Sequence, residues 1–286
     1  MSILNVENVT HGFGARQILD NASFRLLKGE HIGLVGANGE GKSTFLNIIT
    51  GKLPPDEGKI EWCRHITTGY LDQYSTLTKG KTIADVLREA FSHFAELEAE
   101  MLSLYEKMGD LSDDEMTEAM EKVGEIQDIL DYSGYYTIDS KISEYANGLG
   151  LGEIGLERDV SELSGGQRKR ASIAVELISD PSLFFLDEPT SGLDPEAETN
   201  LMHQLKGLSE KKGKTVIVIT HTLQNIRIFD KIIFLAPGGK LCFYGTPKQA
   251  EEFFQVDNLT DAYEKISKDI NGYVKKYNTA KQKGEI

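Results

Sequence analysis

A glycine-rich segment, GANGEGKST at positions 36–44, holds the first residues whose types and spacing could do chemistry. The apolar run HIGLVG precedes the turn and FLNIIT follows it, which predicts a strand, a loop and a helix. Backbone N–H groups in such a turn and at the helix N-terminus point at phosphate oxygens, and glycine allows their close approach. The segment therefore predicts a phosphate cradle rather than a chance polar turn.

Two side chains of this segment have specific roles in that prediction. Lys42 would reach the β- and γ-phosphates of a nucleotide, and the Ser43 hydroxyl would ligate Mg²⁺. We expect Lys42 to be exposed while the loop is empty. The predicted nucleotide-binding residues of the loop are Gly36, Asn38, Gly39, Gly41, Lys42, Ser43 and Thr44.

Two adjacent carboxylates stand at the end of another apolar run, SLFFL at 182–186. Asp187 would hold Mg²⁺ through water, and Glu188 would act as general base on an attacking water. A solvated charge pair is the alternative interpretation. A strand end that carries both acids in a chain with a phosphate loop favours phosphoryl transfer to water.

Two further polar residues follow strand-length apolar runs. His221 comes after TVIVIT, where it could sense a γ-phosphate, and Gln73 lies in GYLDQYSTL after another such run. Taken singly, each residue is ordinary, because a lone histidine is usually a surface or core residue and polar residues commonly follow strands. Their interpretation depends on what else the chain contains.

The segment LSGGQRKR at 163–170 decides that interpretation. With the phosphate loop, the Asp-Glu strand end, Gln73 and His221 in this order, it makes the chain resemble the ATP-binding cassette (ABC) ATPases over about residues 1–250. The resemblance implies ATP and Mg²⁺ as ligands, with Gln73 as a catalytic residue and metal ligand and His221 as the switch histidine. It also implies a signature loop of Ser164, Gly165, Gly166 and Gln167, and a D-loop at 191–194.

Phe13, in HGFGARQIL, falls where this family places an aromatic residue against the adenine ring. A phenylalanine that packs in the core is the competing interpretation at this position.

The elements that must position these residues form a cassette at 1–250 of the α/β class, a P-loop NTPase of the ABC type. We expect a mixed sheet with an antiparallel β part, and a helical subdomain at about 82–180 that carries an inserted helical hairpin at about 81–146. Residues 251–286 would form a helical C-terminal tail, loosely attached after Gln255. The predicted strands are 3–9, 22–27, 31–35, 59–62, 67–71, 182–186, 216–220, 232–236 and 240–245.

The signature loop opens a helix, so its backbone N–H groups could bind anionic oxygens. In the ABC family two cassettes pack head to tail, and each ATP lies between the P-loop of one and the signature of the other. This chain holds one P-loop and one signature. The resemblance therefore implies a second cassette as partner, in a homodimer that forms on ATP binding.

The hairpin region is strongly acidic. Residues 81–146 contain 17 Asp and Glu against 5 Lys and Arg, a net charge of −12 out of −14 for the chain. Apolar residues recur at helical spacing through 83–108, which predicts one amphipathic helix, and Ser112 with Glu115 forms a capping-box pattern that opens a second. We expect the apolar stripes to pack against each other and the charges to be solvated, with a partner surface as the alternative.

Composition narrows the classes of function. The net charge of −14 argues against direct DNA binding, because a phosphate-backbone binder needs a basic face. The two cysteines have no metal or redox spacing, which favours a reducing compartment. We found neither a signal-peptide pattern nor an apolar run of membrane-spanning length, so we expect a cytoplasmic protein that reaches a membrane only through a partner.

The two halves of the chain resemble different branches of the family. Up to about Gln167 the chain is similar to a cassette of the ABC-F translation factors, and beyond Arg168 to the nucleotide-binding domain of a G-type ABC transporter. ABC-F proteins typically have TNYLD and SHD where this chain has TSGLD and THT. We interpret the chain as a mosaic, natural or engineered, joined near the signature loop.

Three functions stay open at this stage. The first is an ATP-hydrolysing cassette that dimerises and drives a membrane domain on another chain, as the carboxyl half implies. The second is a ribosome-associated ATPase, as the amino half implies, although an acidic arm is poorly suited to an RNA contact. The third is a chimeric cassette with weak or no activity as an isolated chain.

Overall fold

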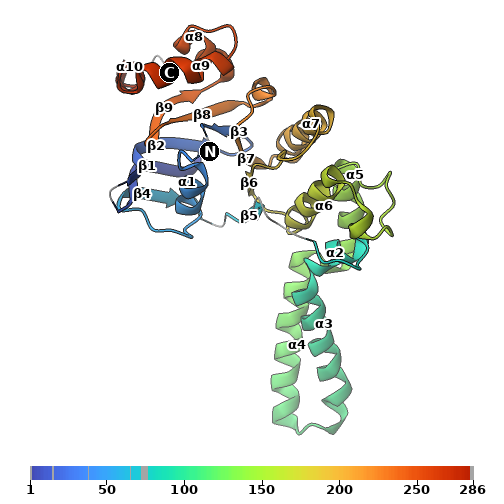
Figure 1. Cartoon of the computed structure of the whole chain (residues 1–286). Helices are drawn as coiled ribbons and strands as arrows, with labels where there is room; N and C mark the ends of the chain where they lie inside the picture. Colours follow the sequence, from blue (N-terminus) through green and yellow to red (C-terminus); the bar gives the residue numbers. More distant parts are fainter. Residues whose placement is uncertain (1, 15, 38, 65, 72–76, 284–286) are drawn as a thin grey trace. The chain divides into compact units, whose positions relative to one another are not determined.

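The computed structural model describes residues 2–14, 16–37, 39–64, 66–71 and 77–283. It divides into two compact units, one formed by Met1–Ser75 with Pro181–Ile286 and the other by Thr76–Asp180. The first unit is built on a sheet and the second on helices (Figure 1). The chain therefore leaves the first unit once and returns to it.

The sheet of the first unit has the strand order β4-β1-β2-β9-β8-β3-β7-β6-β5. Every strand expected from the sequence is present, so the α/β prediction is confirmed. The strands are β1 (Ser2–Phe13), β2 (Arg16–Leu27), β3 (His31–Val35), β4 (Glu57–Trp62), β5 (Thr68–Leu71), β6 (Leu183–Asp187), β7 (Thr215–Thr220), β8 (Lys231–Ala236) and β9 (Lys240–Gly245).

The parallel part of the sheet explains why the apolar runs read as strands. β3, β6 and β7 are buried at every position, as expected for strands covered on both faces. β3 pairs parallel with β7, and β7 pairs parallel with β6, so all three end at the same edge. This edge carries the loops in which the sequence placed its chemistry.

The antiparallel part extends further than expected. β1 and β2 pair from Ser2↔Leu27 to Phe13↔Arg16, whereas the sequence predicted strands over 3–9 and 22–27 only. Register shifts along the pair interrupt the alternation of apolar and polar residues, which hid the distal half of the hairpin. β4 continues this layer antiparallel to β1.

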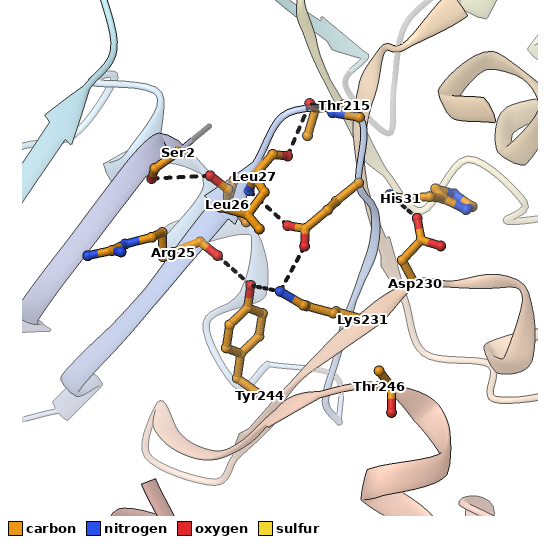
Figure 2. Close-up of polar contacts among 12 residues, drawn as sticks. Ser2, Arg25, Leu26, Leu27, His31, Thr215, Asp230, Lys231, Tyr244 and Thr246 are labelled. Carbon is orange, nitrogen blue, oxygen red and sulfur yellow. Dashed lines mark hydrogen bonds and ion pairs between the residues drawn. The ribbon is translucent and has the colours of Figure 1, made fainter. Parts of the chain in front are cut away.

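A polar network fastens the antiparallel part to the parallel part (Figure 2). The Glu30 carboxylate accepts from the backbone N–H of Leu27 at 2.8 Å and pairs with Lys231 Nζ at 2.7 Å. Lys231 also donates to the Tyr244 hydroxyl at 3.4 Å, and that hydroxyl donates to the Arg25 carbonyl. The network links the ends of β2 and β3 to β8 and β9.

The second unit contains the helices α2 (Ile83–Glu89), α3 (Ser92–Lys107), α4 (Asp113–Ser133), α5 (Ile138–Gly148) and α6 (Gly165–Ile178). Helices α3 and α4 form a long hairpin (Figure 1). Its apolar stripes meet in a core of its own, made of Met101, Val123, Ile126 and Leu130, with Phe94 and Tyr135 packed against it. The Ser112–Glu115 capping box that opens α4 is present as predicted.

The prediction of one helix over 83–108 is wrong, because the chain breaks at Phe91. Helix α2 ends at Glu89 and α3 begins at Ser92, and the backbone of Phe91 leaves the helical region at φ −108°, ψ 8°. The Phe91 carbonyl then accepts from the N–H groups of Phe94 and Ala95, which starts the new helix. The buried side chain of Phe91 keeps the apolar spacing continuous across the break, so the sequence pattern concealed it.

Helices α7 (Pro195–Lys212), α8 (Pro247–Phe254), α9 (Thr260–Lys268) and α10 (Ile270–Lys283) complete the first unit, with α1 (Lys42–Ile49) after the phosphate loop. The expectation of a loosely attached tail is wrong. Tyr277 of α10 is 2% exposed and packs its ring against Phe243 and Phe253. Among the described residues, each helix is too short or too polar to cross a membrane.

Candidate active site

The phosphate loop lies between β3 and α1 and has positions that only glycine can occupy. Gly41 caps α1 at φ 85°, and a Cβ there would lie 2.4 Å from Ile18 Cγ2. A Cβ on Gly36 would lie 2.8 Å from the Leu235 carbonyl oxygen. The backbone of the loop is thus pressed against β2 and β8, which shapes its turn before any ligand binds.

Lys42 is buried, which corrects the expectation that it is exposed in the empty loop. Its side chain is 5% exposed, and Nζ donates to the carbonyls of Gly36 and Ala37 at 2.9 Å each. Burial lowers its pKa, partly offset by the carboxylates of Glu188, Asp187 and Glu40. The ammonium group of Lys42 is thus held by backbone carbonyls of its own loop.

The other predicted residues of the loop are accessible. Ser43 and Gly39 are exposed, and Thr44 is half-buried. Asn38 lies outside the described residues, as does Gln73. Ser43 is therefore open to solvent in the structure.

Phe13 is 55% exposed at the end of β1, so the interpretation as a core residue is wrong. Its ring meets the ring of His11 edge-on, with centroids 4.9 Å apart. An aromatic ring that is more than half exposed has surface available for contact with a planar ligand.

The two carboxylates stand where β6 ends, in different environments. Asp187 is the last residue of the strand and is 5% exposed. Glu188 has φ 46°, a left-handed conformation that is strained for a residue other than glycine, and its N–H donates to the Ile219 carbonyl at 3.1 Å. This strain turns the Glu188 side chain out of the strand direction.

His221 follows β7 directly and contacts the neighbouring loop. Its Nδ1 lies 3.4 Å from Glu188 Oε1. The backbone beside it is fixed, since the N–H of Thr222 donates to Thr220 Oγ1 at 3.1 Å and the Thr222 hydroxyl donates to Glu198 at 2.7 Å. The imidazole therefore sits on a rigid turn next to the candidate base.

Sheet topology explains why these residues meet. The loops after β3, β7 and β6 are neighbours in space because these strands are adjacent and parallel. The structure accordingly brings Lys42, Asp187, Glu188 and His221 together at one edge. Ligands commonly bind at the carboxyl ends of parallel strands.

The signature segment lies in the second unit, at the start of α6. Ser164 caps this helix: its Oγ accepts from the Gln167 N–H at 3.2 Å, and Gln167 Oε1 accepts from the Ser164 N–H at 3.0 Å. Gly165 and Gly166 form the first turn, where backbone N–H groups have no helical partner. Asp194, in the segment compared with a D-loop, caps α7 in a similar way.

The sequence reasoning missed two residues that connect the phosphate loop to neighbouring elements. Arg16 Nη2 donates to the Gly39 carbonyl at 3.0 Å, and Glu40 Oε2 accepts from the Gly238 N–H at 3.0 Å. Of the two, only Glu40 could have been noticed in the sequence, because it is an acidic residue inside a segment expected to bind phosphate. Arg16 gave none, because nothing in its sequence neighbourhood shows that β2 passes beside the loop.

The oxygen ligands at this edge suit Mg²⁺. The Ser43 hydroxyl and the Asp187 carboxylate are hard donors, and Mg²⁺ usually binds through one or two such groups together with water and substrate phosphates. Within the described part of the chain, no cluster of three or more His, Cys, Asp or Glu residues could form an all-protein metal cage. The donor set therefore fits an ion that arrives with a nucleotide.

The chain belongs to the ABC transporter family, whose model matches residues 19–191. It is similar to the uncharacterized ABC transporter ATP-binding protein YfmM of Bacillus subtilis, with 47% identity over 273 residues that cover 94% of this chain and 52% of the relative. It is also 30% identical over 284 residues to the ABC transporter ATP-binding/permease protein Rv1747 of Mycobacterium tuberculosis, covering 96% of this chain and 29% of that protein. The chain thus spans about half or less of these relatives.

A solved ATP-binding cassette, MJ1267, shares the fold with a TM-score of 0.67, covering 93% of this chain and 99% of that one at 22% identity. This likeness confirms the predicted fold class. The alignment with YfmM runs across the proposed join near Arg168, so one relative accounts for both halves of the chain.

Proposed function

We propose that the chain is an Mg²⁺-dependent ATPase cassette that converts ATP and water to ADP and phosphate in the cytoplasm. The observation that carries this proposal is the contact of His221 Nδ1 with Glu188 Oε1 at 3.4 Å, beside a buried Lys42 on which both adjacent carboxylates act. A phosphate cradle, a base and a histidine meet at one sheet edge, which is the arrangement that phosphoryl transfer to water requires.

Nucleotide binding would begin at the phosphate loop. Lys42 exchanges its two carbonyl partners for β- and γ-phosphate oxygens, while the loop and the first turn of α1 donate backbone N–H groups. The adenine ring stacks on the exposed face of Phe13. Mg²⁺, when bound, supplies positive charge at the phosphates and is held by Ser43 and Asp187.

The hydrolytic step needs a proton acceptor and a hold on the γ-phosphate. Glu188 takes the proton of the attacking water, and its position beyond the strand end leaves its carboxylate accessible at 17% exposure. His221 holds the Glu188 carboxylate on one side and reaches the γ-phosphate on the other. We assign Gln73 to the same site on the resemblance alone.

The cassette would work with a second cassette. Gly165 and Gly166 present free N–H groups at the start of α6, and Ser164 and Gln167 hold that turn open through their capping box. An ATP on one cassette would bind these groups on the other, in a head-to-tail homodimer. Rv1747 is described as an ATP-binding/permease protein, which supports a membrane domain as a further partner of this chain.

A ribosome-associated role is the second candidate. The α3–α4 hairpin favours it, because the ABC-F proteins that the amino half resembles carry a helical arm at this place. The charge of −12 over 81–146 weighs against an RNA contact. Cosedimentation of the protein with ribosomes would support the ribosome-associated role, and its recovery in the membrane fraction would support the transporter role.

The test of the ATPase itself uses Glu188→Gln, which keeps the size of the side chain and removes the proton acceptor. Hydrolysis should fall by roughly 100-fold or more, while Mg-ATP binding persists. Glu57→Gln, which neutralises an exposed carboxylate on β4, is the matched control and should leave both unchanged. Equal ATP turnover in the two variants would rule out the assignment of Glu188, and absence of ATP binding by the parent chain would rule out the proposed function.

A further inference from the structure

The phosphate loop contains a carboxylate that phosphate binding does not explain. Glu40 is half-buried, and its Oε2 accepts a hydrogen bond from the backbone N–H of Gly238 at 3.0 Å. Its negative charge also acts on Lys42. A carboxylate within a polyphosphate-binding loop opposes the binding of the ligand, because like charges repel. Its presence in the loop therefore calls for a separate role.

The partner of Glu40 lies in a turn whose position is fixed. Gly238 and Gly239 connect β8 to β9, and the Gly239 carbonyl accepts from the Asp20 N–H of β2 at 3.2 Å. A Cβ on Gly239 would lie 1.6 Å from the carbonyl oxygen of Ile18, and φ there is 67°. The turn is pressed against β2 so closely that it cannot shift toward β2, which makes it a firm anchor for the Glu40 carboxylate.

A second contact holds the other side of the loop. Arg16 Nη2, from the start of β2, donates to the Gly39 carbonyl at 3.0 Å. The loop is thus held on one side by Arg16 of β2 and on the other by the hydrogen bond between its own Glu40 and the β8–β9 turn. Of these two contacts, the one made by Glu40 brings a negative charge to the phosphate loop. Glu40 can therefore affect both the position of the loop and its charge, and substitutions of Glu40 can separate these two effects.

We propose that Glu40 is a positioning residue that tethers the phosphate loop to the β8–β9 turn. Its negative charge also weakens nucleotide binding, and the effect is larger for ATP than for ADP because ATP carries more phosphate charge. This inference rests on the proposed nucleotide function. The tether keeps the loop in its binding shape, and the charge shortens the residence of bound nucleotide. The two effects together favour a site that binds ATP and still releases it between cycles.

Glu40→Gln separates these effects, because the amide oxygen can still accept from Gly238 while the charge is gone. Affinity should rise about threefold to tenfold for ATP at low salt, less for ADP, and the gain should shrink in concentrated salt, where exposed charges are screened. Glu40→Ala also removes the charge but breaks the tether. The Gly238 amide should then exchange its hydrogen about tenfold faster or more in Glu40→Ala than in Glu40→Gln.

The control is Glu57→Gln, which removes one exposed charge elsewhere in the same unit. If Glu40→Gln binds ATP no more tightly than the Glu57→Gln control, the charge effect is wrong. If the Gly238 amide is equally protected in the alanine and glutamine variants, the tether is wrong. Failure of the parent chain to bind ATP would instead count against the proposed function, and the exchange measurement on Gly238 would still decide the tether.

Discussion

At the scale of single residues, Lys42 has hydrogen-bond partners within its own loop. Nζ donates to the Gly36 and Ala37 carbonyls, and an ammonium group has a third N–H that can donate to a phosphate. Burial lowers the Lys42 pKa, so the ammonium is held less favourably than in water and a polyphosphate restores its charge compensation.

Lys42→Ala should abolish measurable ATP binding, since the only cation seen within the described loop is lost. The free energy of unfolding should fall by about 1 kcal/mol, because two carbonyls lose their hydrogen-bond donor but water can replace it at the exposed Ala37. Fluorescence titration with a labelled ATP and a denaturant melt measure the two effects. Unchanged ATP affinity would contradict the role of Lys42.

His31 gives the protein a pH-dependent stability. It is fully buried at the start of β3, its ring contacts the Phe229 ring at a tilt of 45° with centroids 4.7 Å apart, and Lys206 and Asp230 lie nearby. Burial, followed by the charge of Lys206, lowers its pKa from 6.5 to about 4. The unfolded chain therefore takes up a proton below about pH 6.5 that the folded chain accepts only near pH 4.

The contribution of neutral His31 to stability is therefore complete above pH 6.5 and is lost as the pH falls toward 4. The loss over that window should be about 3 kcal/mol, at roughly 1.4 kcal/mol per pKa unit. His31→Phe should remove this component of the stability profile between pH 7 and pH 4. His93→Phe, on the exposed surface of α3, is the control and should retain it.

At the scale of elements, the α3–α4 hairpin has a separate core. Met101, Val123, Ile126 and Leu130 bury one another, and the side chains packed against this cluster are Phe94, Leu97, Leu104, Met108 and Tyr135. Replacing 93–133 by a short Gly/Ser linker should leave a protein that unfolds cooperatively and binds ATP with the parent's affinity. Circular dichroism during heating and ATP titration test this. A broad, non-cooperative transition would show that the second unit needs the hairpin to fold.

Unlike the hairpin, the C-terminal helices are expected to be needed for the stability of their unit. Tyr277 is 2% exposed between Phe243 and Phe253, so Tyr277→Ala should destabilise the protein by about 3 kcal/mol or more. Tyr132→Ala, at a side chain that is 98% exposed on α4, is the matched control and should change stability by less than about 0.5 kcal/mol. Similar melting temperatures for the two variants would mean that the tail is not packed as described.

The elements also show how far sequence reasoning reaches. Buried parallel strands such as β3 and β7 were predictable, because continuous apolar runs admit few other structures. The break at Phe91 was not, because a buried residue there preserves the helical spacing. A role could be proposed for Glu188 from the sequence, because it directly follows a strand-length apolar run. Arg16 contacts Gly39, a residue distant in the sequence, and no local pattern indicates such a contact. The burial of Lys42 likewise depends on carbonyls whose direction only the folded loop defines.

At the scale of the whole molecule, the P-loop lies in one unit and the signature segment in the other, and we propose that an ATP site forms from the P-loop of one copy and the signature of another. A second copy of the chain would complete it, and ATP that cannot be hydrolysed should hold the two copies together. Glu188→Gln with Mg-ATP should therefore scatter light as a dimer of about 63 kDa, twice the 31.7 kDa of one chain. Without nucleotide the same variant should be a monomer.

Gly165 is the best position at which to block that dimer. A side chain there meets nothing within 4 Å, so Gly165→Arg leaves the Ser164–Gln167 capping box intact while it fills the space in front of the α6 N-terminus. Added to Glu188→Gln, it should return the protein to a monomer that still binds ATP. Gly148→Arg, on an exposed position of α5 that is equally open, is the control and should leave the dimer in place. If Glu188→Gln binds ATP yet stays monomeric at high concentration, the ATP on one chain does not engage the signature of another, and the chain is a nucleotide-binding fold without a dimeric motor.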